Sequence, residues 1–423
     1  MFSSIALAGA PGSIFPGIRP TASWNFARDQ SLRSICGQYT AALVRATSET
    51  HFDGSGVMQT AASGVAAYDH HYDAASGLWI SDGLSVHLAA TNLITNSEDF
   101  SAWTAIVGGT TTTVNDRAAP DGTTTMDKLE QIDNESDGEE SNVFTLSAGT
   151  VYNVSFFCEN DDATAGTFTL YDDTGGTNEG WADITWTAGV PSMANGGGGT
   201  TAITNIVVED VGSGRYRVSA AMTSDATNTA HTVRLFPTNG GGGNGLGSWY
   251  WGAQVTLGAT VQPYIPTTSA AVTRNKDDVQ VADINWSEGT FVVTYRAKNS
   301  GVAAQTFEMH NNSASDRLAH QIDTSNNHAV FIRDGGATQS DHTFGAAADG
   351  ETVSAVVAYK LNDVATVAEN GTLVADGSAT MPTVTTLGIG QKYDEGNTLG
   401  GTIAKLDYYE HRHINDLLQQ LSA

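Results

Sequence analysis

The sequence WGAQVTLGATVQPYIPTTSAAVTR, residues 251–274, marks the boundary between two parts of the chain. Its first residues continue an alternating, aromatic-rich run in which Trp249 and Trp251 fall on the same face, which is the pattern of a β-strand. Pro263 and Pro266 then interrupt the sheet, because proline lacks the amide proton that a sheet ladder needs. We therefore expect one domain to end near residue 266 and another to begin after a short linker.

The composition predicts a large all-β protein. The chain has 423 residues, with 46 glycines and only 15% charged residues, a mixture that suits short strands and tight turns. The formal net charge of −27 repels phosphate and anionic lipid, so we expect no nucleic-acid partner. No apolar run approaches the roughly 20 residues needed to span a bilayer, so we expect no membrane insertion.

Residues 1–21 are rich in glycine and proline, which excludes a helix across this stretch. The sequence predicts an extended N-terminal arm, which is either a frayed terminus or a peptide laid on a partner. Its apolar residues would then form the attachment; they include Phe2, Ile14, Phe15 and Ile18.

Residues 93–266 form the clearest unit of the chain. Strand-like runs alternate with glycine-rich turns and occur at residues 152–157, 167–171, 203–208, 215–221 and 232–236. About eight strands at this spacing favour a jelly roll of two antiparallel sheets.

Residues 275–423 form a second region of strands after a linker at residues 267–274. Asn370-Gly371 lies between two alternating runs, which is the strongest short signal for a β-hairpin, and Asn415 or Asp416 can cap a final helix. Residues 22–92 form either an attachment domain or strands contributed to this C-terminal sandwich. In the second case the middle module is an insertion.

Several motifs of the middle region resemble, in order, those of a carbohydrate-binding-like module in bacteriophage fibre, spike and appendage proteins. The matching segments are NSEDFSAW at 96–103, APDGTTTMDKL at 119–129, GRYRV at 214–218, WGAQV at 251–255 and YIPTT at 264–268. Upstream, YDAASG at 72–77 and TNLI at 91–94 are similar to a turn and segment of the same proteins. The chain departs from the pattern at Ala74, where proline is usual, and at Arg215, where tryptophan is common.

The last region is similar to concanavalin A-like (laminin-G-like) sandwiches. The likeness lies in a G-x-I-x-x-L-x-Y-Y strand followed by a terminal helix, here Gly401, Ile403, Leu406, Tyr408 and Tyr409. Together the resemblances imply tandem antiparallel β-sandwiches, a jelly roll plus a concanavalin A-like sandwich, with an extended N-terminal arm.

The phage resemblance implies a structural virion protein, a head or tail fibre, spike or appendage of a tailed phage or phage-like particle. It implies non-catalytic adhesion to host surface glycan, contacts with other virion proteins through the N-terminal region, and a homo-oligomer, with a trimer favoured. The protein would be made in the host cytoplasm and lie on the virion surface. A ligand-free capsid or tail decoration protein is the first alternative.

A polysaccharide depolymerase is the second alternative, although we expect no enzyme. Glucanases of the concanavalin A-like fold carry an E-x-D-x-x-E strand, and the nearest run here keeps Asp407 and Glu410 but has Lys405 at the first position. Glycoside hydrolysis needs two facing carboxylates, so this departure argues against it.

Sugar binding needs flat aromatic faces with amides and carboxylates beside them. Trp181, Trp186 and Tyr171 lie near a segment rich in Gly, Asn and Asp, and we predict them as carbohydrate-binding residues. Trp103, Trp249, Trp251 and Trp286 fit strand patterns instead and are expected to be packed.

We expect no cofactor, no catalytic residue and no metal-binding residue. The densest acidic run holds Asp133, Glu135 and Asp137, which are weak candidates for a structural calcium ion, although a solvated loop explains the run as well. His70 and His71, like His411 and His413, could ligate a metal, but we interpret both pairs as surface or turn histidines.

Overall fold

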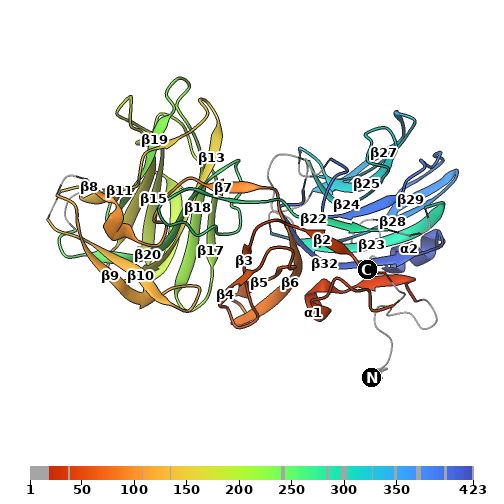
Figure 1. Ribbon diagram of the computed structural model, residues 1–423, viewed down its shortest axis with the longest axis horizontal. Coiled ribbons are helices and arrows are strands. Elements are labelled where there is room, and N and C mark those ends of the chain that lie inside the picture. The colour runs from red at the N-terminus through yellow and green to blue at the C-terminus, as the bar shows by residue number, and fades with distance from the viewer. Residues whose placement is uncertain are drawn as a thin grey trace.

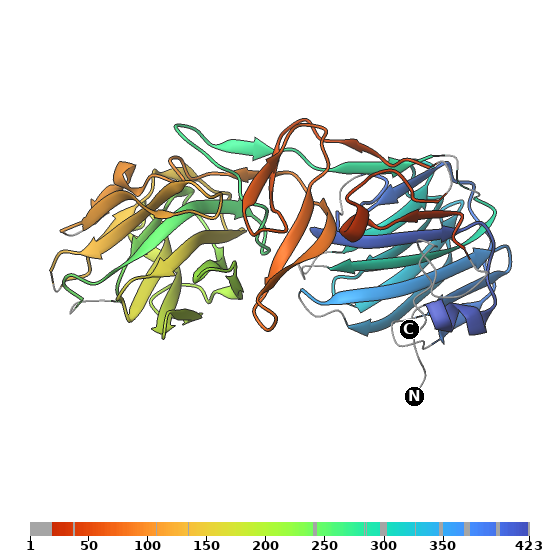
Figure 2. The ribbon, with the colours of Figure 1, turned by 90° about the horizontal axis from the view of Figure 1, so that it is seen from below.

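The computed structural model describes residues 19–36, 39–106, 108–133, 135–239, 243–282, 284, 286–296, 303–325, 327–346, 350–367, 373–394 and 398–421. The predicted attachment residues Phe2, Ile14, Phe15 and Ile18 lie outside the described residues, as does the turn at Asn370-Gly371. The chain is nearly all β-structure and forms two lobes side by side, with a pair of hairpins between them (Figures 1 and 2). The predicted fold class of antiparallel sandwiches is therefore confirmed; the arm is not described.

Two antiparallel sheets make the lobe built from residues 93–266. One sheet contains, in spatial order, β17 (Thr204–Asp210), β18 (Arg215–Thr223), β13 (Val151–Asn160), β20 (Gly247–Leu257), β10 (Thr124–Gln131) and β9 (Thr110–Ala118). The other contains β16 (Val190–Asn195), β15 (Thr177–Thr187), β14 (Ala165–Asp172), β19 (Ala230–Phe236), β11 (Gly138–Glu140) and β8 (Thr104–Ile106), and β12 (Phe144–Thr145) pairs with β19.

The core of this lobe follows from the alternation along its central strands. Phe156 on β13 packs edge-on against Phe168 of the facing sheet, with ring centroids 4.9 Å apart. The opposite face of β13 is also buried, because the segment that follows β20 runs back across it. There the rings of Phe157 and Tyr264 lie 6.1 Å apart. This buried second face connects the lobe to the rest of the molecule.

The second lobe also has two sheets. The larger contains β30 (Leu373–Gly377), β29 (Asp363–Val367), β28 (Thr352–Lys360), β23 (Glu288–Arg296), β32 (Gly401–Tyr409), β6 (Leu78–Val86) and β5 (Tyr68–Asp73), and β1 (Ala22–Trp24) pairs with β32. The smaller contains β2 (Ala42–Val44), β22 (Asp278–Val281), β31 (Thr386–Ile389), β24 (Ala304–His310), β25 (Arg317–Ile322), β26 (Asn327–Asp334) and β27 (Ala337–Ala346). Phe291 and Phe307 pack between the two sheets, with ring centroids 4.7 Å apart.

Strands from before residue 93 belong to this second lobe. β1 and β6 both pair with β32, β5 pairs with β6, and β2 pairs with β22. The chain leaves the lobe through β7 (Ala90–Asn92) and returns through β21 (Val272–Arg274), and these two strands pair with each other. In this topology the module of residues 93–266 is inserted between two parts of one sandwich.

The remaining elements are short. They are a hairpin of β3 (Glu49–Phe52) and β4 (Met58–Ala61), the 3₁₀ turn η1 (Phe100–Ala102), and the helices α1 (Phe26–Asp29) and α2 (Asn415–Leu421). Among the described residues, neither helix has the length and hydrophobicity to cross a membrane.

Candidate functional site

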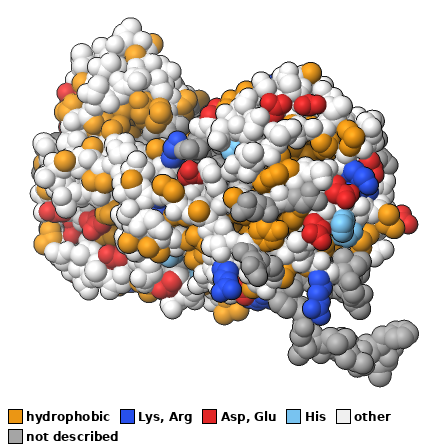
Figure 3. Space-filling view, turned by 45° about the vertical axis from the view of Figure 1, so that its right-hand side comes forward, with side chains coloured by type: hydrophobic (Ala, Val, Ile, Leu, Met, Phe, Trp, Pro, Cys, Tyr) orange, Lys and Arg blue, Asp and Glu red, His pale blue; other side chains and the backbone are white. Residues whose placement is uncertain are grey.

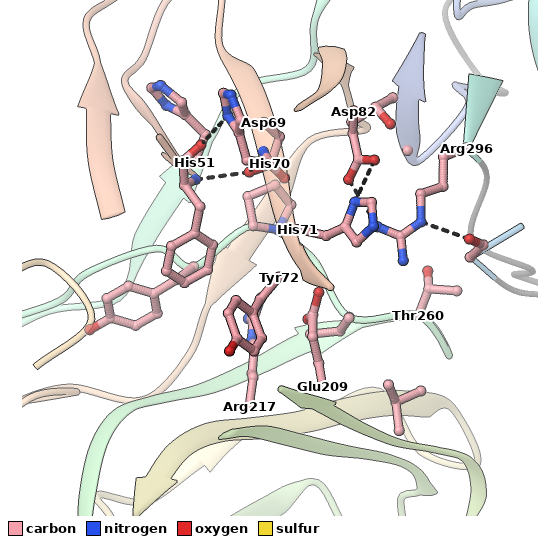
Figure 4. A pocket seen from close by; sticks show the side chains of 18 of the residues that line it. His51, Asp69, His70, His71, Tyr72, Asp82, Glu209, Arg217, Thr260 and Arg296 are labelled. Carbon is pink, nitrogen blue, oxygen red and sulfur yellow. Dashed lines mark hydrogen bonds and ion pairs between the residues drawn. The ribbon is translucent and has the colours of Figure 1, made fainter. Parts of the chain in front are cut away.

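A cleft of about 660 Å³ lies where the two lobes and the intervening hairpins meet. Its walls come from β3 and β5, from β17 and the segment after β20, and from the ends of β23 and β32. Figure 3 shows the hollow between the two lobes, and Figure 4 shows the side chains inside the cleft. Three parts of the chain that are distant in sequence therefore build one polar site.

The β5–β6 hairpin positions the first group of polar side chains. Its turn is closed by Asp73, whose carboxylate accepts hydrogen bonds from the amides of Ala75 and Ser76, while Gly77 supplies a positive φ of 70°. The pairing shifts by one residue between Asp69 and His70, which leaves Asp82 without a direct partner in the register. Such a bulge re-aims side chains.

The bulge brings Asp82 beside His71. Nδ1 of His71 lies 2.7 Å from Oδ1 of Asp82, and Nη1 of Arg296 donates to Oδ2 of the same carboxylate at 2.9 Å (Figure 4). Arg296 ends β23, and its Nε donates to the carbonyl oxygen of Gly350 at 2.7 Å. This imidazole–carboxylate–guanidinium chain joins the hairpin to the second lobe. An ionised carboxylate is only an acceptor, so the neutral ring of His71 carries its proton on Nδ1 and presents Nε2 as an acceptor.

A second histidine group lies on the neighbouring strands. The carboxylate of Asp69 accepts from the amide of Phe52 at 2.8 Å, and Nδ1 of His70 lies 2.9 Å from the carbonyl oxygen of Phe52. Burial lowers the pKa of His51, and the neighbouring His70 lowers it further. His51 is therefore neutral at physiological pH and acts as a polar, uncharged part of the cleft wall.

Arg217 and Glu209 form the floor on the side of the inserted module. They face each other across the β17–β18 pair, and the Nη2 atom of Arg217 donates to the carbonyl oxygen of Gln262 at 2.9 Å. Its guanidinium lies 5.2 Å from the ring centroid of Phe157. Burial lowers the pKa of Arg217 to about 10, which still leaves it charged at neutral pH. No hydrogen bond to the Glu209 carboxylate is present among the described residues.

Aromatic rings pack beneath the cleft and fix its shape. Phe52 lies 4.9 Å from Trp79 and 6.4 Å from Phe157, centroid to centroid, and Trp251 lies 4.7 Å from Tyr264. These rings belong to a separate apolar cluster shared by the hairpins and the inserted module. The WGAQV segment at 251–255 and the YIPTT segment at 264–268 therefore supply rings that support the cleft.

Trp181 is not an open platform for a sugar ring, contrary to the prediction. Its ring stacks on Phe236, with centroids 6.4 Å apart and planes 14° apart, and its Nε1 donates to Asp183 at 2.7 Å. The loop containing Gly196 and Gly198 closes over the ring so tightly that a Cβ on Gly198 would lie 2.7 Å from Cε3 of Trp181. The glycines that suggested an exposed loop instead allow the backbone to pack on this tryptophan.

The rings of Trp186 and Tyr171 are also covered by other side chains, so neither is the open sugar-binding surface that we predicted. Trp186 is a buried core residue that packs edge-on against Tyr216 at 6.4 Å. The guanidinium of Arg234 covers Tyr171, 3.2 Å from the ring centroid. None of the three predicted aromatic residues lines the cleft.

The acidic run does not gather its carboxylates around a common point. Asp137 is buried and accepts from the backbone amides of Gly108 at 3.1 Å and Asp133 at 3.2 Å, and Asp133 accepts from the amide of Glu135 at 2.7 Å. These carboxylates accept backbone hydrogen bonds that close a loop, and a calcium ion at Asp133, Glu135 and Asp137 stays a prediction.

Another acidic group does converge in the described part of the chain. Oxygen atoms of Asp172, Glu179 and Asp225 lie within 4.8 Å of one another. Each already accepts protein hydrogen bonds, for example from Asn228 to Asp172 at 2.7 Å and from Thr227 to Asp225 at 2.7 Å. The backbone and side-chain donors around it explain the cluster without an ion.

The carboxylates weighed for depolymerase chemistry lie apart from the cleft. Asp407 is buried and paired with Lys405 at 2.6 Å, and burial raises its pKa, whereas Glu410 is exposed at the end of β32. His411 lies beside Glu288 at 3.5 Å and His413 packs on Tyr409. None of these residues is among the described lining of the cleft.

The cleft residues that sequence reasoning missed are His51, Asp82, Glu209, Arg217 and Arg296. His70 and His71 were noted but interpreted as surface histidines. The sequence did contain a signal for a strand here. Asp69, His71 and Asp73 alternate with His70 and Tyr72, and this period of two is typical of a β-strand and not of a turn.

No protein-family model and no curated protein matches the chain. Among solved structures, it is similar to the CBM40 of the Ruminococcus gnavus IT-sialidase bound to α2,3-sialyllactose, at 15% identity over 33% of this chain and 83% of that one, with a TM-score of 0.29. It is also similar to mouse laminin α1 chain domains LG4-5, at 10% identity over 65% of this chain and 85% of that one, with a TM-score of 0.23. By its own topology the chain is a two-lobed β-sandwich protein with a polar cleft at the junction.

Proposed function

We propose that this chain is a virion protein of a tailed phage or phage-like particle and that it binds host surface glycan in the junction cleft without cleaving it. The main support for this binding site is that three chain segments converge on one cleft of about 660 Å³. That volume is typical of a site for a small molecule or a few sugar units. The five phage-like motifs of the inserted module, found in the same order in the sequence, support the virion role.

The cleft offers the groups that sugars require. Tyr72 and Phe52 contribute aromatic surface for the C–H face of a pyranose, and Glu209, His71 and Thr260 contribute polar atoms for hydroxyl groups (Figure 4). The site lies at an interface between structural units, where ligand sites are common. The rigid supporting cluster of aromatic rings favours a preformed site that needs little rearrangement on binding.

In this proposal the protein lies on the virion surface as a head or tail fibre, spike or appendage. The N-terminal arm contacts other virion proteins, and the two lobes project outward. We propose a homo-oligomer, with a trimer favoured, as in the phage proteins that the sequence resembles.

The test is binding of the purified, labelled chain to candidate host cells before and after periodate oxidation of their surface glycans. Thr260→Trp places a bulky ring in the cleft without removing any charged group. Thr343→Trp, on the edge strand β27 and outside the cleft, makes the same change at an exposed position. We expect periodate-sensitive binding that Thr260→Trp abolishes and Thr343→Trp retains.

Three other results would each contradict a part of the proposal. Binding that survives Thr260→Trp would place the glycan elsewhere on the chain. New reducing ends released from host polysaccharide would indicate a depolymerase. No binding to any candidate host, together with binding to particles that lack this chain, would indicate the ligand-free decoration protein.

A further inference from the structure

The described lining of the cleft carries more acidic than basic groups. Its carboxylates are Asp69, Asp82, Glu209 and Asp210, whereas its guanidinium groups are Arg217 and Arg296. The four acids and two arginines give a formal charge of −2 when the imidazoles are neutral. The chain as a whole carries −27, so the field outside the cleft has the same sign. An acidic sugar would approach against this field.

Two nitrogen atoms of Arg296, the more accessible cation, already donate to protein acceptors. Its Nη1 is 2.9 Å from Asp82 and its Nε is 2.7 Å from the carbonyl oxygen of Gly350. A sugar carboxylate that took over the Asp82 contact would leave that aspartate and the ligand as two neighbouring anions. Like charges in one partly desolvated site repel each other strongly.

Arg217, the second cation of the cleft, is buried. Its Nη2 donates to Gln262 and to Ser155, and its Nε is a buried donor without an acceptor among the described residues. Glu209 stands opposite it in the β17–β18 register and compensates its charge. The charge of this cation is therefore compensated locally at the floor of the cleft.

Several carboxylate and imidazole acceptors of the cleft remain available to a ligand. The Glu209 carboxylate has no hydrogen-bond donor among the described residues. Within the described part of the chain, the carboxylate of Asp210 accepts through Oδ1, from the amide of Gly212 at 2.8 Å. Nε2 of neutral His71 is an acceptor because Nδ1 faces Asp82. Acceptors of this kind match the hydroxyl donors of a sugar.

We infer that the ligand of the junction cleft is an uncharged glycan, held through hydroxyl groups that donate to Glu209 and His71, and that acidic sugars are disfavoured. This inference rests on the proposed function, because it names the class of glycan for the same cleft. Selectivity arises from repulsion of the wrong ligand as well as from contacts with the right one.

The experiment compares one glycan in two charge states. Oligosaccharides released from host surface polysaccharide are titrated calorimetrically into the full chain, before and after their uronic acids are activated with a carbodiimide and reduced with borohydride to neutral sugars. We expect the reduced, neutral form to bind at least tenfold more tightly. We also expect its affinity to stay constant between low and high salt, since no ion pair with the ligand is screened.

Two charge-matched variants tie the result to the cleft. Glu209→Gln removes the charge-assisted acceptor and should weaken binding of the neutral form about tenfold. Asp341→Asn removes one negative charge from the exposed strand β27, outside the cleft, and should leave the affinity unchanged.

The outcomes distinguish failure of the neutral-glycan inference from failure of the proposed glycan binding itself. Tighter binding of the acidic form, weakened by salt, would overturn the inference and leave glycan binding intact. Equal binding of both forms, or an unchanged affinity of Glu209→Gln, would also overturn it. Failure of both forms to bind, with the chain shown to be folded by circular dichroism, would count against the proposed function itself.

Discussion

The guanidinium of Arg45 lies 2.7 Å from the carboxylate of Asp277, 232 residues further along the chain. Both side chains are fully buried. The same arginine bonds Glu49 at 2.8 Å, and Arg274 approaches Asp277 at 3.3 Å. Two arginines and two carboxylates thus form a buried network where the chain returns from the inserted module. This network fixes one wall of the junction on which the cleft depends.

Replacing Arg45 with methionine should destabilise the protein by about 3–5 kcal/mol, because Glu49 loses its buried ion-pair partner and Asp277 keeps only Arg274. Chemical denaturation monitored by tryptophan fluorescence measures this change. Arg28→Met is the control, since Arg28 pairs with Asp29 at the surface and is half exposed. Its effect should stay within about 0.5 kcal/mol. Equal losses of unfolding free energy for the two substitutions would mean that the buried network contributes no more to stability than a surface ion pair.

We expect the stability of the protein to depend also on Asn92, which lies where the chain enters the inserted module. Its buried amide donates to the carbonyl oxygens of Ala253 at 3.0 Å and Ile265 at 2.9 Å and accepts from the amides of Ile94 and Val255. Asn92→Ala should cost about 2–4 kcal/mol, because these backbone groups lose their partner while buried. Asn92→Asp keeps the size but cannot donate, so it should be at least as destabilising. An aspartate variant with wild-type stability would contradict this account.

The strands of the fold could be predicted from the sequence, but their pairing could not. The strand-like runs at residues 152–157, 215–221 and 232–236 predicted strands that the structure has as β13, β18 and β19. Alternation reports which residues share a face, a local property. It does not report the partner strand, so the pairing of β6 with β32 remained one of two alternatives until the structure was known.

The candidate site was less predictable for two physical reasons. A β-bulge decides that Asp82 meets His71, and a one-residue register shift leaves no mark in the composition of either strand. Arg217 and Arg296 reach the cleft from different lobes, and the sequence gives no distance between them. Trp181 was misassigned because glycine-rich sequence reads as an exposed loop, although close packing on an aromatic ring requires glycine too.

Acid should destabilise the second lobe through His320. Burial, with a smaller contribution from the neighbouring His328, lowers the pKa of this histidine to about 3. The unfolded chain, with a histidine pKa near 6.5, then binds the proton more readily than the folded chain does. The stabilising effect is fully present above about pH 6.5 and is lost progressively as the pH falls toward 3.

The measurement is the free energy of unfolding between pH 7 and pH 4 for the wild type and His320→Gln. The variant should be less stable at pH 7, because the ring stacks on Phe307 and lies 2.7 Å from the hydroxyl of Thr306. Its curve should be flatter, and the wild type should lose about 3 kcal/mol more by pH 4. Parallel curves would show that the proton binds elsewhere.

Trp181 provides the last prediction, because two opposite roles can be distinguished with one variant. As a sugar platform it would lower glycan affinity when replaced by alanine and leave stability nearly unchanged. As the packed residue that the structure shows, it should cost about 2–3 kcal/mol of stability, since Phe236 and the loop of Gly196 and Gly198 lose their contact surface. Cell binding of the folded Trp181→Ala protein should match the wild type, because the ring lies outside the cleft.

The matched substitution is Gly198→Ala, which leaves Trp181 in place but puts a methyl group 2.7 Å from its ring. The tryptophan must shift, so the near-ultraviolet circular dichroism should change and the stability should fall, while cell binding stays constant. Loss of binding in both variants at full stability would return the glycan site to the Trp181 face and away from the junction. Loss of stability with binding intact would place Trp181 in the support of the inserted module.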